Sequence, residues 1–385
     1  MTDAPAVIVV GYSARALASS AKRAGFVPLS IDVFGDDDTR QMSLAAIKLE
    51  GGLSDGLTLD KVAAAVEALA RVHRPIGLVY GPGFEHQPET VAALARMTHV
   101  FGNEAETVER AKDPLAFARL CEAIGIMHPP IRLTLPDEPE RWLVKKRGGA
   151  GGAHIGPATA ALLPASDCYF QRRVAGDNIS AMFVANGKAA RILGLSAQWT
   201  APTPTSPFRY GGAAGPLDVG GARAQEIACA VARIASQLRL VGLNSADFVI
   251  SPDTVWLMEI NPRPGATLDV FEPDEGSLFA VHLAGCEGRL PPIPQYSACK
   301  AAEIVYAPCD FVSCAAPNWP EWTADRPPPE TRFTAGDPVC TTLAIGATVD
   351  LAKDRAHARS QHIIAVVQER IGDNRRDHQR QSQRR

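Results

Sequence analysis

The chain has 385 residues, of which 46% are hydrophobic and 21% are charged, and its formal net charge is −3. This composition is typical of a globular protein, and the length is sufficient for roughly two to four domains. The nearly neutral charge gives no reason to expect nucleic acid or a membrane surface as a partner, so the function must be sought in local motifs.

The sequence shows no sign of export, membrane insertion or cysteine cross-linking. No basic leader precedes the first apolar run at residues 6–11, and no apolar stretch reaches the roughly 18 residues of a membrane span. These features indicate a cytoplasmic protein. The eight cysteines form no C-x-x-C pair, which argues against a zinc knuckle and a disulfide framework.

The N-terminal part alternates between strand and helix patterns, as in an open α/β sheet. Apolar runs predict strands at 6–11, 26–35 and 75–85, and helical patterns occur at 13–25, 59–73 and 89–97. The segment "GYSARA" lacks the later glycines of a dinucleotide fingerprint, so an NAD site is not expected.

Ligands of an open α/β sheet gather beyond the carboxyl ends of its strands. Four residues at these predicted ends are therefore candidate substrate contacts: Ser13, Arg15, Asp32 and Glu85. Arg15, in the first turn of a predicted helix, is suited to an anion, although a solvated surface arginine explains it equally well.

A glycine-rich loop follows a short predicted strand in "RWLVKKRGGAGGAHIG". Its glycines can place bare backbone N–H groups around phosphate oxygens, with Lys145 or Lys146 adding charge. The loop lacks the P-loop signature, and a flexible hairpin tip would explain it about equally well. Upstream, Asp113 and Pro114 are suited to the N-cap and first position of a helix.

The middle of the chain is rich in predicted strands. Residues 168–199 predict successive strands, 200–217 a long Gly/Pro-rich loop, and 221–239 a helix. Arg191, Arg209 and Tyr210 are expected to border the substrate cleft, although such a loop needs polar residues for solubility anyway.

Polar residues end the apolar run in "VWLMEINPR", which follows the strand pattern "LVGLNSADFVI" across a turn. Positions two apart share one face of a strand, so Glu259, Asn261 and Arg263 would converge. A hairpin would bring Asp247 beside them. Such oxygen ligands, with coordination positions left open, suit Mg²⁺ beside phosphates, although a polar strand end before Pro262 is also an ordinary exit from a sheet.

The order of these features resembles the ATP-grasp superfamily. The features are a lysine before a helix, a strand lysine followed by a glycine loop, the hinge strand "YFQRRVAGD", and Asp followed by Glu-x-Asn. The resemblance covers roughly residues 102–288. The texture of the whole chain, including "DVFGDDDTR" and "EINPRPGATLDVFE", is similar to the ATP-dependent carboligases related to biotin carboxylase, a group associated with tetrahydromethanopterin and methanofuran metabolism.

The resemblance implies a mixed α/β and α+β fold. Its expected parts are an N-terminal open α/β domain (1–110), an ATP-grasp lid subdomain with the glycine loop (111–170), a metal and nucleotide lobe (171–290), and a small β-rich C-terminal region (291–371). The polar basic tail (372–385) is expected to be disordered.

The resemblance also implies roles for individual residues. ATP would lie between two lobes, in contact with Lys112, Lys145, Gly148, Gly149, Gly151, Gly152, Gln171, Arg173, Val174 and Asp177. Gln171 stands where many relatives have Glu and can still accept from the adenine amino group. Asp177 and Asn178 compete for the ribose.

For the chemistry, the resemblance implies that Asp247, Glu259 and Asn261 hold one or two Mg²⁺ ions, with Mn²⁺ as a substitute. Arg263 and Lys145 would be catalytic, with Arg263 stabilising an acyl phosphate. The implied activity is ATP-dependent ligation of a small carboxylate to an amine, with one-carbon cofactor biosynthesis as a setting and a homodimer as an expected assembly. A bicarbonate-using carboxylase and a nucleotide-binding scaffold without turnover stay open as alternatives.

Overall fold

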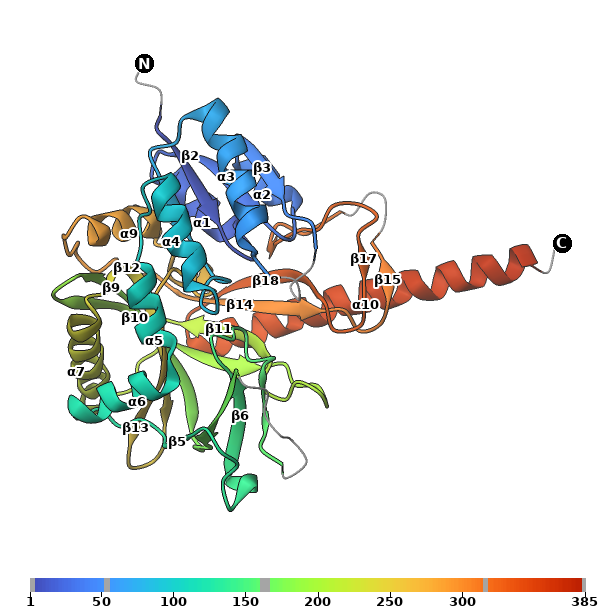
Figure 1. Cartoon of the computed structure of the whole chain (residues 1–385). Coiled ribbons are helices and arrows are strands. Elements are labelled where there is room, and N and C mark those ends of the chain that lie inside the picture. The colour runs from blue at the N-terminus through green and yellow to red at the C-terminus, as the bar shows by residue number, and fades with distance from the viewer. Residues whose placement is uncertain (1–3, 52–55, 160–166, 314–317, 383–385) are drawn as a thin grey trace.

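The computed structural model of the chain describes residues 4–51, 56–159, 167–313 and 318–382. It combines an N-terminal parallel sheet, a large antiparallel sheet and a smaller four-stranded sheet (Figure 1). The mixed α/β fold class predicted from the sequence is therefore confirmed. Among the described helices, none is both long and apolar enough to cross a membrane.

The N-terminal sheet is parallel and has the strand order β3-β2-β1-β4. Its elements are β1 (Ala6–Val10), α1 (Arg15–Arg23), β2 (Val27–Asp32), α2 (Asp37–Met42), β3 (Ala45–Lys48), α3 (Leu59–His73), β4 (Leu78–Tyr80) and α4 (Pro88–Met97). Helices cover both faces, so Val9 packs toward one side and Ile8 toward the other. The sequence did not predict α2 and β3, which are short and carry polar residues.

The large sheet has eight strands in the order β13-β12-β9-β10-β11-β14-β18-β16. The strands are β9 (Asp177–Asn186), β10 (Ala190–Thr200), β11 (Tyr210–Gly215), β12 (Val241–Ile250), β13 (Val255–Asn261), β14 (Cys299–Tyr306), β16 (Thr323–Ala324) and β18 (Pro338–Gly346). Strands of the C-terminal region thus continue the sheet that carries the predicted metal ligands. The boundary predicted between residues 290 and 291 separates segments of one sheet.

Strand β11 lies inside the segment that the sequence predicts to be a long loop. Its glycines permit very close neighbours, because a Cβ on Gly212 would lie 2.5 Å from the Ala302 carbonyl oxygen and from the Trp199 ring. Glycine weakens a strand pattern in sequence but allows a backbone to approach this closely. The loop prediction for residues 210–215 is therefore wrong.

The smaller sheet carries the glycine loop and has the order β5-β8-β6-β7. Its strands are β5 (Ile131–Arg132), β6 (Trp142–Lys146), β7 (Ile155–Pro157) and β8 (Cys168–Arg172), and Trp142 and Phe170 form its core. The predicted boundary between residues 170 and 171 falls within β8. The two-stranded sheet β15 (Phe311–Val312) and β17 (Arg332–Phe333) lies further along the chain.

The remaining helices join these sheets. They are α5 (Ala105–Lys112), α6 (Pro114–Ala123), α7 (Gly221–Leu238), α8 (Leu268–Phe271) and α9 (Leu278–Cys286), with the short 3₁₀ helix η1 (Pro139–Arg141). The predicted cap of α6 is confirmed, since the Asp113 carboxylate accepts a hydrogen bond of 2.7 Å from the Ala116 N–H and Pro114 opens the helix.

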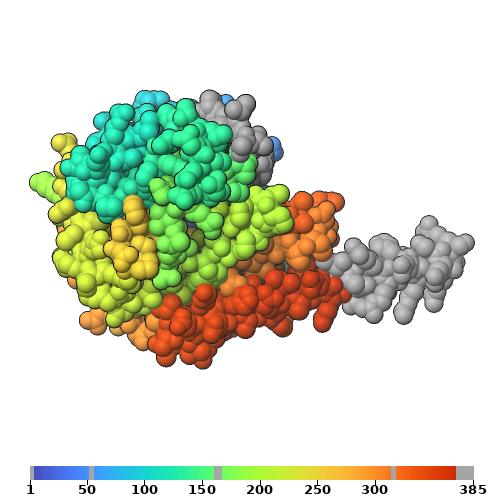
Figure 2. All heavy atoms as spheres, turned by 90° about the horizontal axis from the view of Figure 1, so that it is seen from below, coloured from blue at the N-terminus to red at the C-terminus, as the bar shows by residue number. Residues whose placement is uncertain are grey.

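Helix α10 (Val349–Ser382) packs along β14 and β18 through the fully buried Ala352 and Ala356. In Figure 2 its coloured part, in red, lies along one side of the molecule. The helix continues to Ser382, where the sequence predicts disorder for 372–382. That segment has one glycine and no proline, so its composition does not interrupt a helix. Residues 383–385 of the predicted tail lie outside the described residues.

Asn103 ties the segment before α5 to the large sheet. Its side-chain N–H groups donate to Asn244 Oδ1 (2.8 Å) and to the Pro262 carbonyl oxygen (2.9 Å). Its Oδ1 accepts from the Val241 N–H (2.9 Å), and the residue is 2% exposed. These bonds fix the start of α5 relative to β12 and the end of β13.

We expect Asn103→Ala to lower the free energy of unfolding by about 3 kcal/mol, because it leaves buried groups of Asn244 and Val241 without their partner. Urea unfolding of the variant and wild type measures the loss. The matched control is Asn318→Ala at an exposed position, where a change of about 0.5 kcal/mol or less is expected. Equal losses in the two variants would contradict the assigned role of Asn103.

Candidate active site

The predicted metal ligands meet at the end of the β12 and β13 hairpin. In the antiparallel register Asp247 lies opposite Glu259, and the ladder shifts just after Asp247. The Asn261 side-chain N–H donates to Asp247 Oδ2 (3.0 Å). The structure therefore brings Asp247, Glu259 and Asn261 together, as the period of two along the strand predicts for Glu259 and Asn261 and the hairpin predicts for Asp247.

Lys112, the last residue of α5, lies against this group. Its ammonium donates to Asn261 Oδ1 (2.8 Å) and to Glu259 Oε2 (3.3 Å), and its side chain is 7% exposed. Lys145 on β6 is also buried. Burial lowers the pKa of Lys145 and the charge of Lys112 lowers it further, while Glu259 and Asp247 act in the opposite direction.

The two carboxylates differ strongly in their environment. Burial, followed by the charge of Glu259, raises the pKa of Asp247 to about 6, although the Ser180 hydroxyl donates to it at 2.7 Å. Burial would also raise the pKa of Glu259, but Lys112 and Lys145 lower it to about 2. Because 38% of the Glu259 side chain is exposed, solvent reduces the cost of burying its charge, and the effect of the two lysines on its pKa is the larger one. Cations are thus strongly favoured at this hairpin end.

The donor set at this hairpin end fits Mg²⁺. Two carboxylates and an amide oxygen are the oxygen ligands that this ion takes, with water and phosphate completing its octahedron. Across the described ranges, no group of three or more His, Cys, Asp or Glu side chains could hold a metal ion. The third protein ligand would therefore be the amide oxygen of Asn261.

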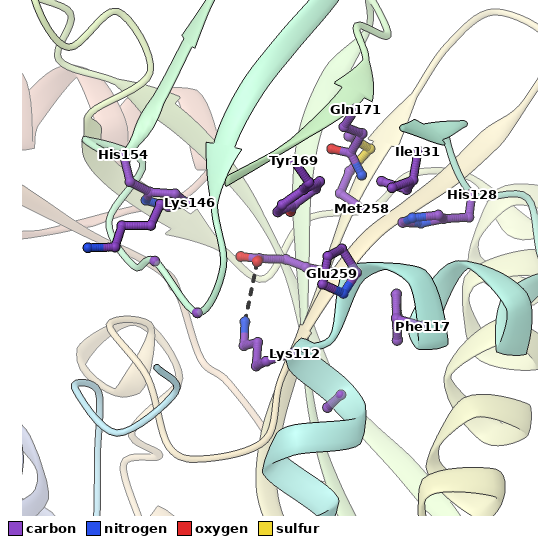
Figure 3. A pocket seen from close by; sticks show the side chains of 14 residues that line it. Lys112, Phe117, His128, Ile131, Lys146, His154, Tyr169, Gln171, Met258 and Glu259 are labelled. Atoms are coloured by element: carbon purple, nitrogen blue, oxygen red, sulfur yellow. Dashed lines mark hydrogen bonds and ion pairs between the residues drawn. The ribbon is translucent and has the colours of Figure 1, made fainter. Parts of the chain in front are cut away.

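A pocket extends from these residues and has an apolar and a polar end. Figure 3 shows Gln171, Ile131, Met258 and His128 on one side, Lys146 and His154 on the other, and Glu259 and Lys112 between them. Phe117 lies beside His128. Such a pocket suits a flat apolar group joined to an anion.

The glycine loop lies at the polar end of the pocket, and glycine is required there. Gly148 has φ +63° and a Cβ on it would lie 2.6 Å from the Glu85 carbonyl oxygen. Gly152 has φ +72°, and a Cβ on it would lie 2.0 Å from the Phe208 carbonyl oxygen. The Tyr210 N–H donates to the Gly151 carbonyl oxygen (2.9 Å). The loop therefore lies between the N-terminal sheet and β11.

The other predicted nucleotide contacts lie at varying places. Lys112, Gly148, Gly149 and Gln171 line the pocket, whereas Lys145, Gly151, Gly152, Arg173, Val174 and Asp177 lie outside its lining. Arg173 and Val174 connect β8 to β9, and the Arg173 N–H donates to the Arg141 carbonyl oxygen (2.8 Å). Asp177 and Asn178 are both exposed at the start of β9.

Arg263 pairs with Glu85 in a buried contact. The guanidinium donates to Glu85 Oε1 at 2.7 Å, and the two side chains are 8% and 3% exposed. Burial would raise the pKa of Glu85, but Arg263 and Lys112 lower it. The Glu85 backbone lies beside Gly148, which lines the pocket.

The other candidate substrate residues of the N-terminal sheet gather elsewhere. Arg15 is 5% exposed and donates to Asp269 (2.5 Å) and Asp325 (3.1 Å). The Ser13 hydroxyl donates to Asp325 (3.0 Å), and the Asp32 carboxylate accepts from the backbone N–H of Ala14 (3.2 Å). The structure thus divides the predicted set, with Glu85 apart from Ser13, Arg15 and Asp32. Arg15 is already paired with two carboxylates, so its predicted role in anion binding gains no support here.

The three residues predicted to border the cleft also differ. Arg191 donates to the carbonyl oxygens of Leu290 (3.2 Å) and Pro291 (2.5 Å). Arg209 donates to the Gly336 carbonyl oxygen (3.0 Å) and stacks on the Tyr306 ring. Both arginines therefore bind backbone and anchor other segments. Tyr210 contacts the glycine loop, and its hydroxyl is buried without a hydrogen-bond partner in the part of the chain that the structure describes.

Two pocket histidines were missed by the sequence analysis. The His154 ring lies against Gly149, where a Cβ would approach it at 2.3 Å, and its position inside "GGAHIG" was an available signal. His128 donates from Nδ1 to the Leu257 carbonyl oxygen (2.7 Å). That contact joins residues 129 positions apart, so no local pattern indicates it.

Comparison with known proteins agrees with this geometry. Residues 115–267 match the family described as the ATP-grasp domain. A search among curated proteins found no match to this sequence. The chain therefore carries an ATP-grasp domain, and the predicted resemblance is confirmed at that level. The narrower group linked to tetrahydromethanopterin and methanofuran stays a prediction.

Several solved structures share the fold. N5-carboxyaminoimidazole ribonucleotide synthetase from Thermotoga maritima has a TM-score of 0.66 and 13% identity, covering 93% of this chain and 98% of that chain. N5-carboxyaminoimidazole synthetase from Staphylococcus aureus, complexed with ADP, has a TM-score of 0.67 and 14% sequence identity, and the match covers 94% of this chain and 98% of that chain. The biotin carboxylase domain of Hydrogenobacter thermophilus 2-oxoglutarate carboxylase, in complex with MgADP, ADP and bicarbonate, has a TM-score of 0.68 and 12% sequence identity. The match covers 90% of this chain and 88% of that chain.

The acidic group around Arg15 includes one aspartate with an unusual environment. Burial and then the charges of Asp325, Asp32 and Asp38 raise the pKa of Asp36 to about 8. Among the residues described, Asp36 Oδ2 has no hydrogen-bond partner. The folded state therefore favours the protonated form of Asp36.

We expect the contribution of Asp36 to stability to fall as pH rises from about 4 to about 8, because folded Asp36 binds its proton more tightly than an unfolded aspartate with pKa 3.8 does. Asp36→Asn removes this loss, so the variant should exceed wild type by about 1 kcal/mol or more at pH 8, with a smaller difference at pH 5. Urea unfolding at both pH values tests this. Asp253→Asn at an exposed position is the control, and parallel pH profiles of wild type and Asp36→Asn would contradict the assignment.

Proposed function

We propose that this chain is an ATP- and Mg²⁺-dependent ligase that joins a carboxylate to an amine through an acyl phosphate. The observation that carries the proposal is the convergence of Lys112, Glu259 and Asn261 at the pocket beneath the glycine loop. The related folds complexed with ADP or MgADP support a nucleotide as the ligand of this pocket.

The pocket residues would divide the nucleotide between them. The apolar end with Ile131, Met258 and Gln171 suits adenine, and the glycine loop with Lys112 and Lys145 suits the phosphates. Asp247, Glu259 and Asn261 would hold Mg²⁺, which neutralises phosphate charge and orients the transferred group. Arg173, Val174 and Asp177 are proposed contacts of the hinge and ribose.

The chemistry would proceed in two displacements. A carboxylate oxygen of the acid attacks the γ-phosphorus and ADP leaves. An amine nitrogen then attacks the acyl carbon, phosphate leaves, and the nitrogen gives up one proton, which the released phosphate can take up. Lys112 and Lys145 stabilise the charge on the transferred phosphoryl group. Arg263, oriented by Glu85, would stabilise the acyl phosphate, and the glycine loop would exclude water.

A bicarbonate-using carboxylase is the second candidate, because one related fold was solved with bicarbonate and MgADP. The carboxylate would then be bicarbonate, and the product a carbamate or a related carboxylated nitrogen. One-carbon cofactor biosynthesis is the proposed setting of the first candidate, and it rests on the sequence resemblance alone.

Release of ADP distinguishes these functions. Purified protein with ATP and Mg²⁺ is assayed against pairs of carboxylic acids and amines, against bicarbonate, and without acceptor. We expect ADP release only with an acid and amine together. Release with bicarbonate in place of the acid would favour the carboxylase, and ADP binding without release under any condition would favour a scaffold.

We expect Glu259→Gln to reduce metal-dependent turnover by roughly a hundredfold or more, because it removes the charge of a metal ligand while keeping its shape. The melting temperature should stay close to that of wild type. ADP release across a Mg²⁺ titration measures the effect, with the exposed Glu226→Gln as matched control. Near-normal turnover of Glu259→Gln at saturating substrate would refute the assignment of Glu259 as a metal ligand.

A further inference from the structure

Two hydrogen-bond acceptors at the apolar end of the pocket have no partner among the residues that the structure describes. Gln171 is 1% exposed. Within the described ranges, neither its Oε1 nor His128 Nε2 has a hydrogen-bond partner, and both atoms are shut off from solvent. Leaving a buried acceptor unpaired costs about 1–3 kcal/mol, so such atoms commonly mark the place of a ligand.

The orientation of the His128 ring is fixed by β13. Its Nδ1 lies 2.7 Å from the Leu257 carbonyl oxygen, which can only accept, so the proton is on Nδ1. The Leu257 N–H in turn donates to the Met127 carbonyl oxygen (2.9 Å). The edge-on contact with Phe117, at 5.4 Å between ring centres, holds the ring from the other side.

This tautomer leaves Nε2 of a neutral His128 ring as an acceptor only. Burial, opposed by the hydrogen bond to Leu257 and aided by the nearby Lys145, lowers the pKa of His128 to about 4, so the ring stays neutral near pH 7. Nε2 therefore cannot donate a hydrogen bond to a ligand under ordinary conditions.

Gln171 lies on the same side of the pocket as His128. It is the direct cross-strand neighbour of Ile131, which lies three positions after His128. Figure 3 shows Gln171, Ile131 and His128 on one side of the pocket, with Met258 among them. An apolar slot with two acceptors would suit a flat ring that carries a two-hydrogen donor.

We infer that His128 and Gln171 together recognise the 6-amino group of adenine. His128 Nε2 and Gln171 Oε1 would each accept a hydrogen bond from one of the two amino hydrogens. This inference rests on the proposed nucleotide binding and adds the residue that selects the base. A purine with a 6-keto oxygen would present an acceptor to both atoms and leave all three unpaired. A purine with hydrogen at that position would leave both protein acceptors unpaired.

The test is isothermal titration of the full chain with three nucleotides in Mg²⁺ buffer: ADP, inosine diphosphate and purine riboside diphosphate. The variants are His128→Phe, which keeps a ring against Phe117, and His128→Leu as a second replacement. His73→Phe, at the end of α3, is the matched control. Thermal melting confirms that each protein is folded. The comparison of the three nucleotides on the wild-type protein does not depend on any variant being folded.

We expect wild type to bind ADP roughly tenfold or more tightly than the other two nucleotides. His128→Phe should lose roughly tenfold in affinity for ADP and little for purine riboside diphosphate, and His73→Phe should match wild type. Equal weakening for both nucleotides would reduce His128 to a packing role and overturn the inference. Equal binding of all three by wild type would overturn it as well, with the proposed function intact. Failure of wild type to bind any of them would overturn the proposed function itself.

Discussion

The candidate site depends on the ion contact between Lys112 and the β12–β13 hairpin. Lys112 comes from α5, whereas Glu259 and Asn261 come from β13, so this one ammonium joins two separate parts of the chain. The hairpin register is equally decisive. A shift by one residue would turn Glu259 and Asn261 to the opposite face and remove both contacts. The hydrogen bonds of Asn103 to Val241 at the start of β12 and to Pro262 help hold α5, and with it Lys112, in position beside the hairpin.

The segment that follows β13 extends this dependence to the N-terminal sheet. Arg263 pairs with Glu85, which follows β4. Asp269 pairs with Arg15 at the start of α1, and Glu272 accepts from the Ser20 hydroxyl (2.8 Å). One stretch of fourteen residues, 259–272, thus supplies two of the three predicted metal ligands and several polar contacts to the N-terminal sheet and its helices.

The sequence predicted what depends on local periodicity and missed what depends on distant partners. The period of two correctly placed Glu259 and Asn261 on one face, and the cap of α6 followed from Asp113 and Pro114. The sequence favoured Arg15 as an anion site because its aspartate partners lie 254 and 310 positions away, where no local pattern indicates them. His128 was missed for the same reason.

The glycines did not reveal their structural roles in the sequence, because the role of a glycine depends on which neighbouring atoms pack against it. The glycines of β11 allow a central strand where their composition indicated a loop. In the loop at 148–152, Gly148 and Gly152 instead adopt positive φ, and they meet backbone atoms of Glu85 and Phe208, respectively.

The same backbone contacts determine how the loop can act. Since Gly148 and Gly152 meet carbonyl oxygens directly, its position is set by backbone shape, with the Tyr210 N–H to Gly151 bond as a further anchor. A side chain at either glycine would push the loop away from both neighbours, because neither carbonyl can rotate aside. The loop can therefore cover the polar end of the pocket only with glycine at these positions. Its contact with Glu85 also places the loop next to the carboxylate that pairs with Arg263, so the position of the loop and the orientation of that guanidinium both involve Glu85.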